Sequence, residues 1–92
     1  MHAQNSGIEK TFGALSDRTR MAIIERLSSG EVSLSDLAKP FKMSQTAVTK
    51  HVKILSEAGL VQVNKRGRTR FCELLPTPMQ EAERWLETYQ LF

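Results

Sequence analysis

The stretch "MSQTAVTKHVKIL", residues 43–55, has the pattern of a helix with two different faces. Successive residues of a helix are rotated by about 100°, so Val48, Val52 and Leu55 fall on one side. The remaining apolar residues on this half are Ala47, Ile54 and Ala58. Ser44 stands where an N-cap is expected, and Gly59 where the left-handed residue after a helix is expected. The pattern predicts a helix over 45–58 that packs on a core along one side.

The opposite face of this helix is cationic and rich in hydrogen-bonding groups. It is formed by Gln45, Thr46, Thr49, Lys50, Lys53, Ser56 and Glu57. The major groove of DNA admits a helix, and there glutamine can pair with adenine, lysine with guanine, and threonine with a thymine methyl group or a phosphate. The N-terminal end of a helix also favours phosphate. We therefore predict a DNA-binding recognition helix whose contacts are Ser44, Gln45, Thr46, Thr49, Lys50 and Lys53.

Two more helices are predicted before this one. Ser16-Asp17 is typical of an N-cap, and the apolar residues that follow have helical spacing. The sequence "SLSD", residues 33–36, has the spacing of a capping box and predicts a short helix that Pro40 must end or closely follow. The four-residue turn 40–43 then joins two helices, as in a helix-turn-helix.

The period of the pattern changes after Gly59. The sequence "LVQVNKRGRTRFCEL", residues 60–74, alternates apolar and polar residues, and Arg66-Gly67 stands in the middle, where a β-hairpin needs positive φ. Residues 76–92 return to helical spacing, with Thr77 as the expected N-cap and Pro78 at the first helical position. With a first short helix over 8–15, the order is α-α-α-α-β-β-α. We predict a mainly α fold with a small β-hairpin, a winged helix-turn-helix.

Length and composition are those of one small domain, 1–92. No apolar run approaches the ~18 residues of a membrane span, and residues 1–6, which we expect to be disordered, lack the features of a signal peptide. The net charge of +3 conceals a strong asymmetry. Residues 39–70 hold eight Lys or Arg against one Glu, whereas the flanks carry net negative charge. Such a block indicates a polyanion-binding face, although a solvated surface with chance clustering is the simpler alternative.

Part of this charge lies in the predicted hairpin, or wing. The four cations around Gly67 are Lys65, Arg66, Arg68 and Arg70. On an alternating strand, Arg68 and Arg70 would share one face, and Thr69 and Phe71 the other. We predict that the wing contacts phosphate or the minor groove.

The first and last helices carry apolar stripes that one small core cannot cover. The first stripe contains Ile8, Phe12 and Leu15, and the second contains Met79, Ala82, Trp85, Leu86 and Tyr89. The two stripes, in 8–15 and 76–92, therefore leave apolar surface for a further contact, and a ligand pocket around Trp85 is one alternative.

Three stretches together resemble the ArsR/SmtB family of winged-helix repressors. They are "FGALSDRTRMAIIERL" (12–27), "GEVSLSDLAKPFKMSQTAVTKHVKILSEAGLV" (30–61) and "KRGRTRFCEL" (65–74). The resemblance implies a homodimer that binds an imperfect palindromic operator in double-stranded DNA and represses transcription by blocking promoter access. It also implies that the terminal helices form the dimer interface.

The sequence departs from the metal-sensing members of that family. Their Cys-x-Cys signature matches Ser33 and Ser35 here, and a hydroxyl is a poor ligand for soft metals. Other members use Asp and His on the last helix, and residues 76–92 contain neither. We therefore predict a subgroup without the metal-binding cysteines, with no metal and no cofactor. Cys72, the one cysteine, is expected to be buried, and an intermolecular disulfide or a modified thiol stays open.

The resulting hypothesis is a cytoplasmic, metal-independent, sequence-specific repressor. The alternative is a winged-helix module for protein–protein interaction without DNA specificity. An enzyme is not expected, because no catalytic constellation is present. His51 falls within the apolar arc, so a partly buried, locally satisfied histidine explains it better than a metal or catalytic role does. The sequence does not define the operator, the regulated genes or any small-molecule inducer.

Overall fold

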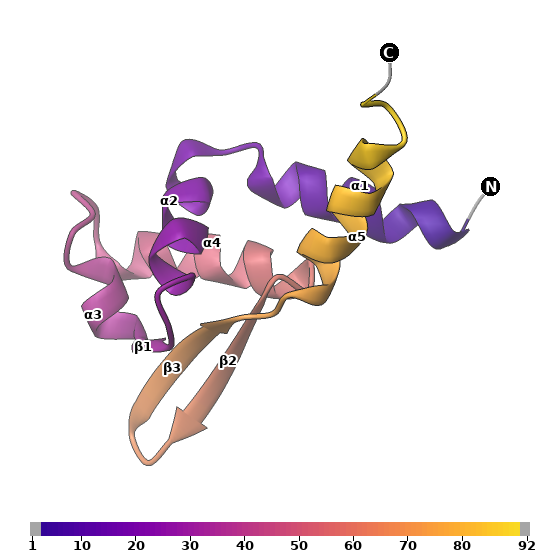
Figure 1. The fold of residues 1–92 in the computed structure, drawn as a ribbon. Helices are drawn as coiled ribbons and strands as arrows, with labels where there is room; N and C mark the ends of the chain where they lie inside the picture. Colours follow the sequence, from indigo (N-terminus) through magenta and orange to yellow (C-terminus); the bar gives the residue numbers. More distant parts are fainter. Residues whose placement is uncertain (1–2, 91–92) are drawn as a thin grey trace.

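The computed structural model describes residues 3–90 and shows a helix-turn-helix followed by a hairpin. The elements are α1 (Ala3–Leu15), α2 (Arg18–Leu27), β1 (Val32–Ser33), α3 (Leu34–Ala38), α4 (Gln45–Glu57), β2 (Val61–Arg66), β3 (Thr69–Leu74) and α5 (Thr77–Glu87). The β2–β3 hairpin projects from the helices, while α1 and α5 lie together at the end where the chain begins and ends (Figure 1). Across residues 3–90, no helix has the length and apolar character that a membrane span requires.

Three helix starts follow from local hydrogen bonds. Asp17, Ser33 and Ser44 each have extended backbone and accept a backbone N–H three residues later. Gly59 follows α4 with φ +78°, a left-handed conformation that glycine adopts without strain. The predicted caps of α2, α3 and α4 are thereby confirmed.

The two terminal helices differ from the prediction. Helix α1 begins at Ala3, before the predicted start at residue 8, and residues 1 and 2 lie outside the described part. The expected disorder of residues 1–6 stays a prediction. At the other end, Pro76 is the N-cap of α5 and forms no side-chain cap hydrogen bond, so the assignment of Thr77 as the cap is wrong. Pro78 is then the second helical residue, where its missing N–H is still harmless.

The sheet has three strands in the order β1-β3-β2, all antiparallel. Strand β1 was not predicted, because two residues are too short to show a period. The hairpin turn consists of Gly67 and Arg68, with Arg66 opposite Thr69, and it lies one residue later than predicted. Gly67 has φ +63°, as the first residue of a tight two-residue hairpin turn requires.

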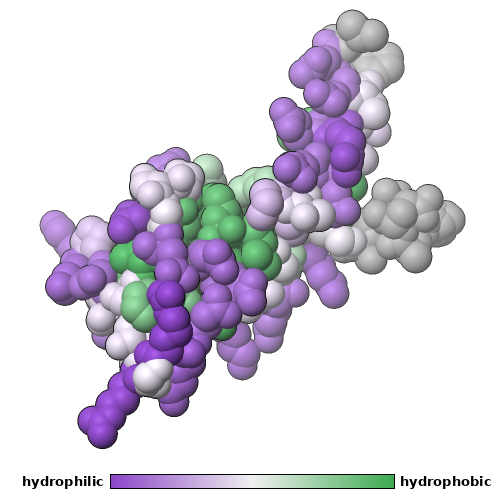
Figure 2. Space-filling model, turned by 60° about the horizontal axis from the view of Figure 1, so that its bottom comes forward, coloured by the Kyte–Doolittle hydropathy of each residue, from purple (hydrophilic) through white to green (hydrophobic). Residues whose placement is uncertain are grey.

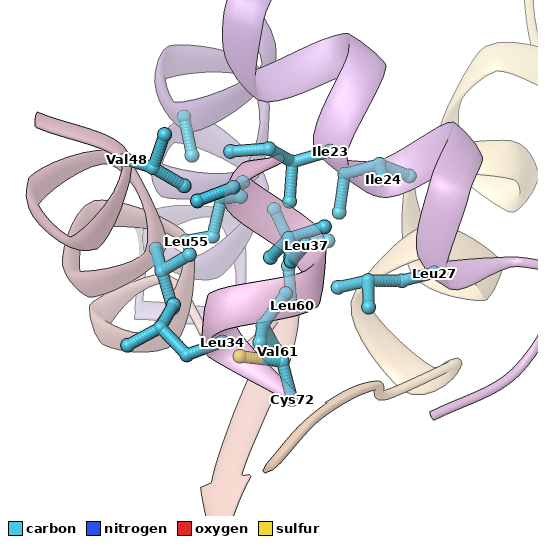
Figure 3. Packing of buried hydrophobic residues seen from close by; sticks show 13 residues of the cluster. Ile23, Ile24, Leu27, Leu34, Leu37, Val48, Leu55, Leu60, Val61 and Cys72 are labelled. Carbon is cyan, nitrogen blue, oxygen red and sulfur yellow. The ribbon is translucent and has the colours of Figure 1, made fainter. Parts of the chain in front are cut away.

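The core lies between α2, α3, α4 and the base of the sheet (Figure 3). Its fully buried apolar members include Ile23 and Leu27 of α2, Leu37 of α3, Val48 and Leu55 of α4, and Leu60, Val61 and Cys72. Ile54, which shares the apolar half of α4 in the sequence pattern, is instead 41% exposed. The core thus fixes one side of α4 and leaves the other side free.

Candidate nucleic-acid interface

The outer face of α4 consists of Gln45, Thr46, Thr49, Lys50 and Lys53. All are exposed except Thr49, which is half-buried. The opposite side of the helix is held by Val48, Val52 and Leu55, each at most 3% exposed. The face therefore presents two ammonium groups, an amide and two hydroxyls to solvent on a helix whose position the core determines.

Two hydroxyls near the start of α4 have defined hydrogen bonds. The Ser44 Oγ accepts the Ala47 N–H at 3.1 Å, and Thr49 donates its hydroxyl to the Gln45 carbonyl at 2.8 Å. Ser44 still carries a proton that it can donate to a phosphate oxygen. Thr49 has used its proton and offers an acceptor oxygen and a methyl group, which suits contact with a base edge.

The wing brings two cations to the outer face of α4. A hollow of about 310 Å³ is lined by Gln45 and Thr49 from one side and by Arg68 and Arg70 from the other. A second hollow of about 410 Å³ contains Thr49, Lys53 and Arg70. Lys65 is exposed and directly opposite Arg70 in the strand register. Figure 2 shows the strongly hydrophilic hairpin projecting from the body on this side.

Arg66 lies on the other face of the hairpin. Its guanidinium donates to the Glu31 carboxylate at 2.7 Å and stacks on the Phe71 ring with its central carbon 3.9 Å from the centroid. The register explains the difference, because Arg66 shares a face with Thr69 and Phe71 and not with Arg70. The structure therefore places two of the four predicted wing cations, Arg68 and Arg70, beside the outer face of α4. It leaves Lys65 exposed opposite Arg70 and pairs Arg66 within the chain.

His51 has a half-buried ring, as predicted, but its partners are distant in sequence. Its Nδ1 lies 3.2 Å from Nη1 of Arg20, a residue 31 positions away, and 3.8 Å from the Asp17 carboxylate. The expectation that His51 is satisfied locally is therefore wrong. No local spacing links His51 to Asp17 or Arg20, and only the packing of α2 on α4 brings it to them.

The positions that match the metal-sensing cysteines have structural roles here. Ser33 caps α3, and its Oγ lies 3.4 Å from that of Ser35. Asp36 pairs with Lys39 at 2.8 Å, and this hydrogen bond lowers the pKa of the Asp36 carboxyl group. Within the described residues, no group of three or more His, Cys, Asp and Glu is arranged to hold a metal ion.

Cys72 is fully buried in the centre of the sheet, which confirms the expected burial. The loss of hydration raises the pKa of its thiol. Since the thiolate is the reactive form, the folded chain holds this sulfur in its unreactive state.

The apolar stripes of α1 and α5 meet each other and remain partly exposed. Phe12 contacts Trp85 edge to face, with ring centroids 5.6 Å apart, and Trp85 contacts Tyr89 at 4.9 Å. Ile8, Phe12 and Trp85 line one hollow between the helices. Trp85, Leu86 and Tyr89 are 39–53% exposed, whereas Ala82 is 5% exposed and Met79 packs on the core. Two of the predicted interface residues, Ala82 and Met79, are thus covered by the single chain itself.

The fold and this cationic face define a winged helix-turn-helix domain. Comparison with known proteins agrees: residues 15–64 match a family model described as a helix-turn-helix domain. The chain is 39% identical over 69 residues to the transcriptional regulator Rv2034 of Mycobacterium tuberculosis, covering 75% of this chain and 64% of that protein. It is 28% identical over 79 residues to the transcriptional repressor SdpR of Bacillus subtilis, covering 86% and 88% of the two chains.

Among solved structures, the crystal structure of an ArsR family transcriptional regulator superposes with a TM-score of 0.89 and 37% identity. The match covers 98% of this chain and 93% of that one. The chain belongs to the ArsR family of helix-turn-helix transcriptional regulators, and this is not a family of enzymes. The chain spans about two thirds of the length of Rv2034, so activities of the longer protein do not transfer directly.

Proposed function

We propose that this chain is a sequence-specific DNA-binding repressor that acts as a homodimer in the cytoplasm, where its target DNA lies. One observation carries the proposal: the core holds α4 by one side only, and the other side presents Gln45, Thr46, Thr49, Lys50 and Lys53 beside Arg70 of the wing. Helix α4 inserts into the major groove, where its amide, hydroxyl and ammonium groups match base edges. The wing cations neutralise phosphates alongside.

The homodimer is supported by the exposed Trp85, Leu86 and Tyr89 of α5, which lie beside the half-buried Ile8 and Phe12 of α1. Two copies joined there would carry two recognition helices, which in a dimeric reader are separated by about one turn of DNA, ~34 Å. An imperfect palindrome is the operator that such a symmetric pair fits. Repression follows if the operator overlaps a promoter, because the bound dimer then excludes polymerase, and the repressor SdpR is one of the relatives.

Metal independence is supported by the chemistry of the residues at the sensing position. Hydroxyls at 33 and 35 replace thiolates, and Ser33 is already occupied as the cap of α3. Zinc, cadmium or arsenite should therefore leave the affinity for the operator unchanged, as measured by fluorescence anisotropy. Release of the DNA by any of them would contradict this part of the proposal.

The proposal that α4 reads the DNA sequence is tested by measuring the affinity for two duplexes. One duplex is selected by the wild-type protein from a random library, and the other is a scrambled duplex of the same composition. Replacing Thr49 and Lys50 together with Ala should bring the affinity ratio between the two duplexes close to one. Circular dichroism and thermal unfolding should show that the fold is unchanged. Lys10→Ala, which removes an exposed lysine from α1, is the matched control and should keep the ratio.

Two results would contradict the proposal. If the double variant keeps the wild-type ratio, α4 is not the reading element. If the wild-type protein selects no preferred sequence, it is not a sequence-specific regulator, and the alternative of a protein–protein interaction module without DNA specificity gains support.

A further inference from the structure

A polar cluster behind α4 connects three helices through one side chain. Arg20, in the first turn of α2, donates Nε–H to the Ala14 carbonyl at 2.6 Å and Nη1–H to His51 Nδ1 at 3.2 Å. Its backbone N–H donates to the Asp17 carboxylate at 3.1 Å. The same residue thus contacts the end of α1, the cap of α2 and the middle of α4.

The direction of each hydrogen bond follows from the chemistry. Arginine has donors only, so His51 must accept at Nδ1 and carry its proton on Nε2. The Ala14 carbonyl belongs to the last turn of α1, where helix carbonyls lack intrahelical partners and a cation is favoured. The guanidinium of Arg20 therefore donates hydrogen bonds both to the Ala14 carbonyl of α1 and to His51 of α4. The nearby Asp17 carboxylate balances the positive charge of the guanidinium.

The location of this cluster relates it to DNA reading. His51 lies between Lys50 of the outer face and Val52 of the core side. The packed side chains of Val48, Val52 and Leu55 hold α4 against the core, but the hydrophobic effect that drives this packing is non-directional and adds no angular constraint of its own. A hydrogen bond constrains both distance and angle, and two of them on one rigid guanidinium relate α4 to α1. Helix α1 in turn packs on α5 through Phe12 and Trp85.

We infer that Arg20 is a positioning residue for DNA recognition: by joining the Ala14 carbonyl to His51, it fixes the rotation of α4 relative to α1 and α5. The inference rests on the proposed function, because it concerns how the outer face of α4 is aimed. Bidentate base contacts tolerate little misplacement, whereas phosphate attraction tolerates much more. Loss of the Arg20 link should consequently reduce discrimination between sequences more than it reduces binding to DNA in general.

The experiment compares variants by the affinity ratio between the selected and the scrambled duplex. Arg20→Met keeps an apolar stem without donors, and His51→Leu removes the acceptor. Each should lower the ratio by about 10-fold to 100-fold, the loss of discrimination expected when about one bidentate base contact is misaligned. The double variant should be no worse than the poorer single variant, because both remove the same link.

His51→Asn provides the rescue that a merely structural role would not predict. An Asn Oδ1 lies near the place of Nδ1 and can accept from Arg20, so this variant should keep a ratio close to that of the wild type. If Arg20→Met does not fold, the comparison of His51→Leu with His51→Asn still decides the matter.

Three outcomes overturn the inference: an unchanged ratio in a folded Arg20→Met or His51→Leu, equal ratios for His51→Leu and His51→Asn, or additive losses in the double variant. A wild-type ratio of one is a different failure. It would contradict the proposed function itself and would be visible before any variant is made.

Discussion

Cys72 illustrates how burial decides the role of a single side chain. It lies between Val32 and Val63 in the strand register and is fully buried. Cys72→Ser would place a hydroxyl in this apolar site and should lower the free energy of unfolding by about 1–3 kcal/mol. Urea unfolding measures the loss, with Cys72→Ala as the control that removes the sulfur without adding a polar group. A serine variant as stable as the wild type would contradict the prediction.

Asp17 should make stability depend on pH. The backbone N–H of Arg20 donates to its carboxylate and lowers the pKa of that group below its ordinary value of 3.8, against the opposing effect of desolvation. Because the folded state favours the ionised form, Asp17 contributes stability above pH 3.8, and this contribution is lost as the pH falls through the lowered pKa.

Asp17→Asn keeps an oxygen that can cap α2 but cannot ionise. The wild type should exceed this variant in unfolding free energy at neutral pH, and the difference should shrink below pH 3.8, as measured by urea unfolding in a series of buffers. A difference that stays constant into acid would show that the charge of Asp17 is irrelevant.

At the scale of elements, the wing offers a matched pair of arginines. Arg70 lines the hollows beside α4, whereas Arg66 pairs with Glu31 and Phe71 on the opposite face. Arg70→Gln should weaken binding to all duplexes and reduce the slope of log affinity against log salt by about 0.9, the value of one phosphate contact. Arg66→Gln should change this slope much less.

Titrations of both variants at several salt concentrations provide the measurement. Equal slopes for the two variants would show that the register does not separate the roles of the two arginines.

The elements also show what the sequence can predict. The caps at Asp17, Ser33 and Ser44 depend on contacts three residues apart, so a local pattern was sufficient. The hairpin was predicted, but the turn was placed one residue early, because Arg66-Gly67 and Gly67-Arg68 both put a glycine at a central position. Because of this difference of one residue, Arg68 belongs to the turn and not to the predicted strand, and Arg66 belongs to a strand, where it pairs with Glu31.

At the scale of the whole molecule, the part of the candidate DNA interface that lies on α4 could be predicted from the sequence. The outer face of α4 follows from a 3.6-residue period, and the structure leaves its side chains available. The link between Arg20 and His51 was not predictable, since its partners meet only through packing of α2 on α4. The same applies to Ala82 and Met79, whose places on an apolar stripe do not reveal whether the chain itself covers them.

Assembly is the last property that the whole molecule determines. Leu86 of α5 is 51% exposed on the stripe that includes Trp85, and Met21 of α2 is equally exposed but lies on a different helix. Burying a charge without a partner in an apolar interface is costly, so Leu86→Glu should convert a dimer into monomers while each chain stays folded. Met21→Glu adds the same charge and should leave the dimer intact. Sedimentation at several concentrations, with circular dichroism for the fold, distinguishes the two.

DNA binding should follow the change in assembly. A dimer engages both halves of a palindrome, whereas a monomer engages one half and forgoes the gain in effective concentration from the second site. Leu86→Glu should therefore bind the full selected duplex little better than an isolated half-site, and the wild type and Met21→Glu should strongly prefer the full duplex. A wild-type protein that sediments as one chain and does not distinguish full from half sites would contradict the α1–α5 interface, while the reading role of α4 would still be tested by Thr49 and Lys50.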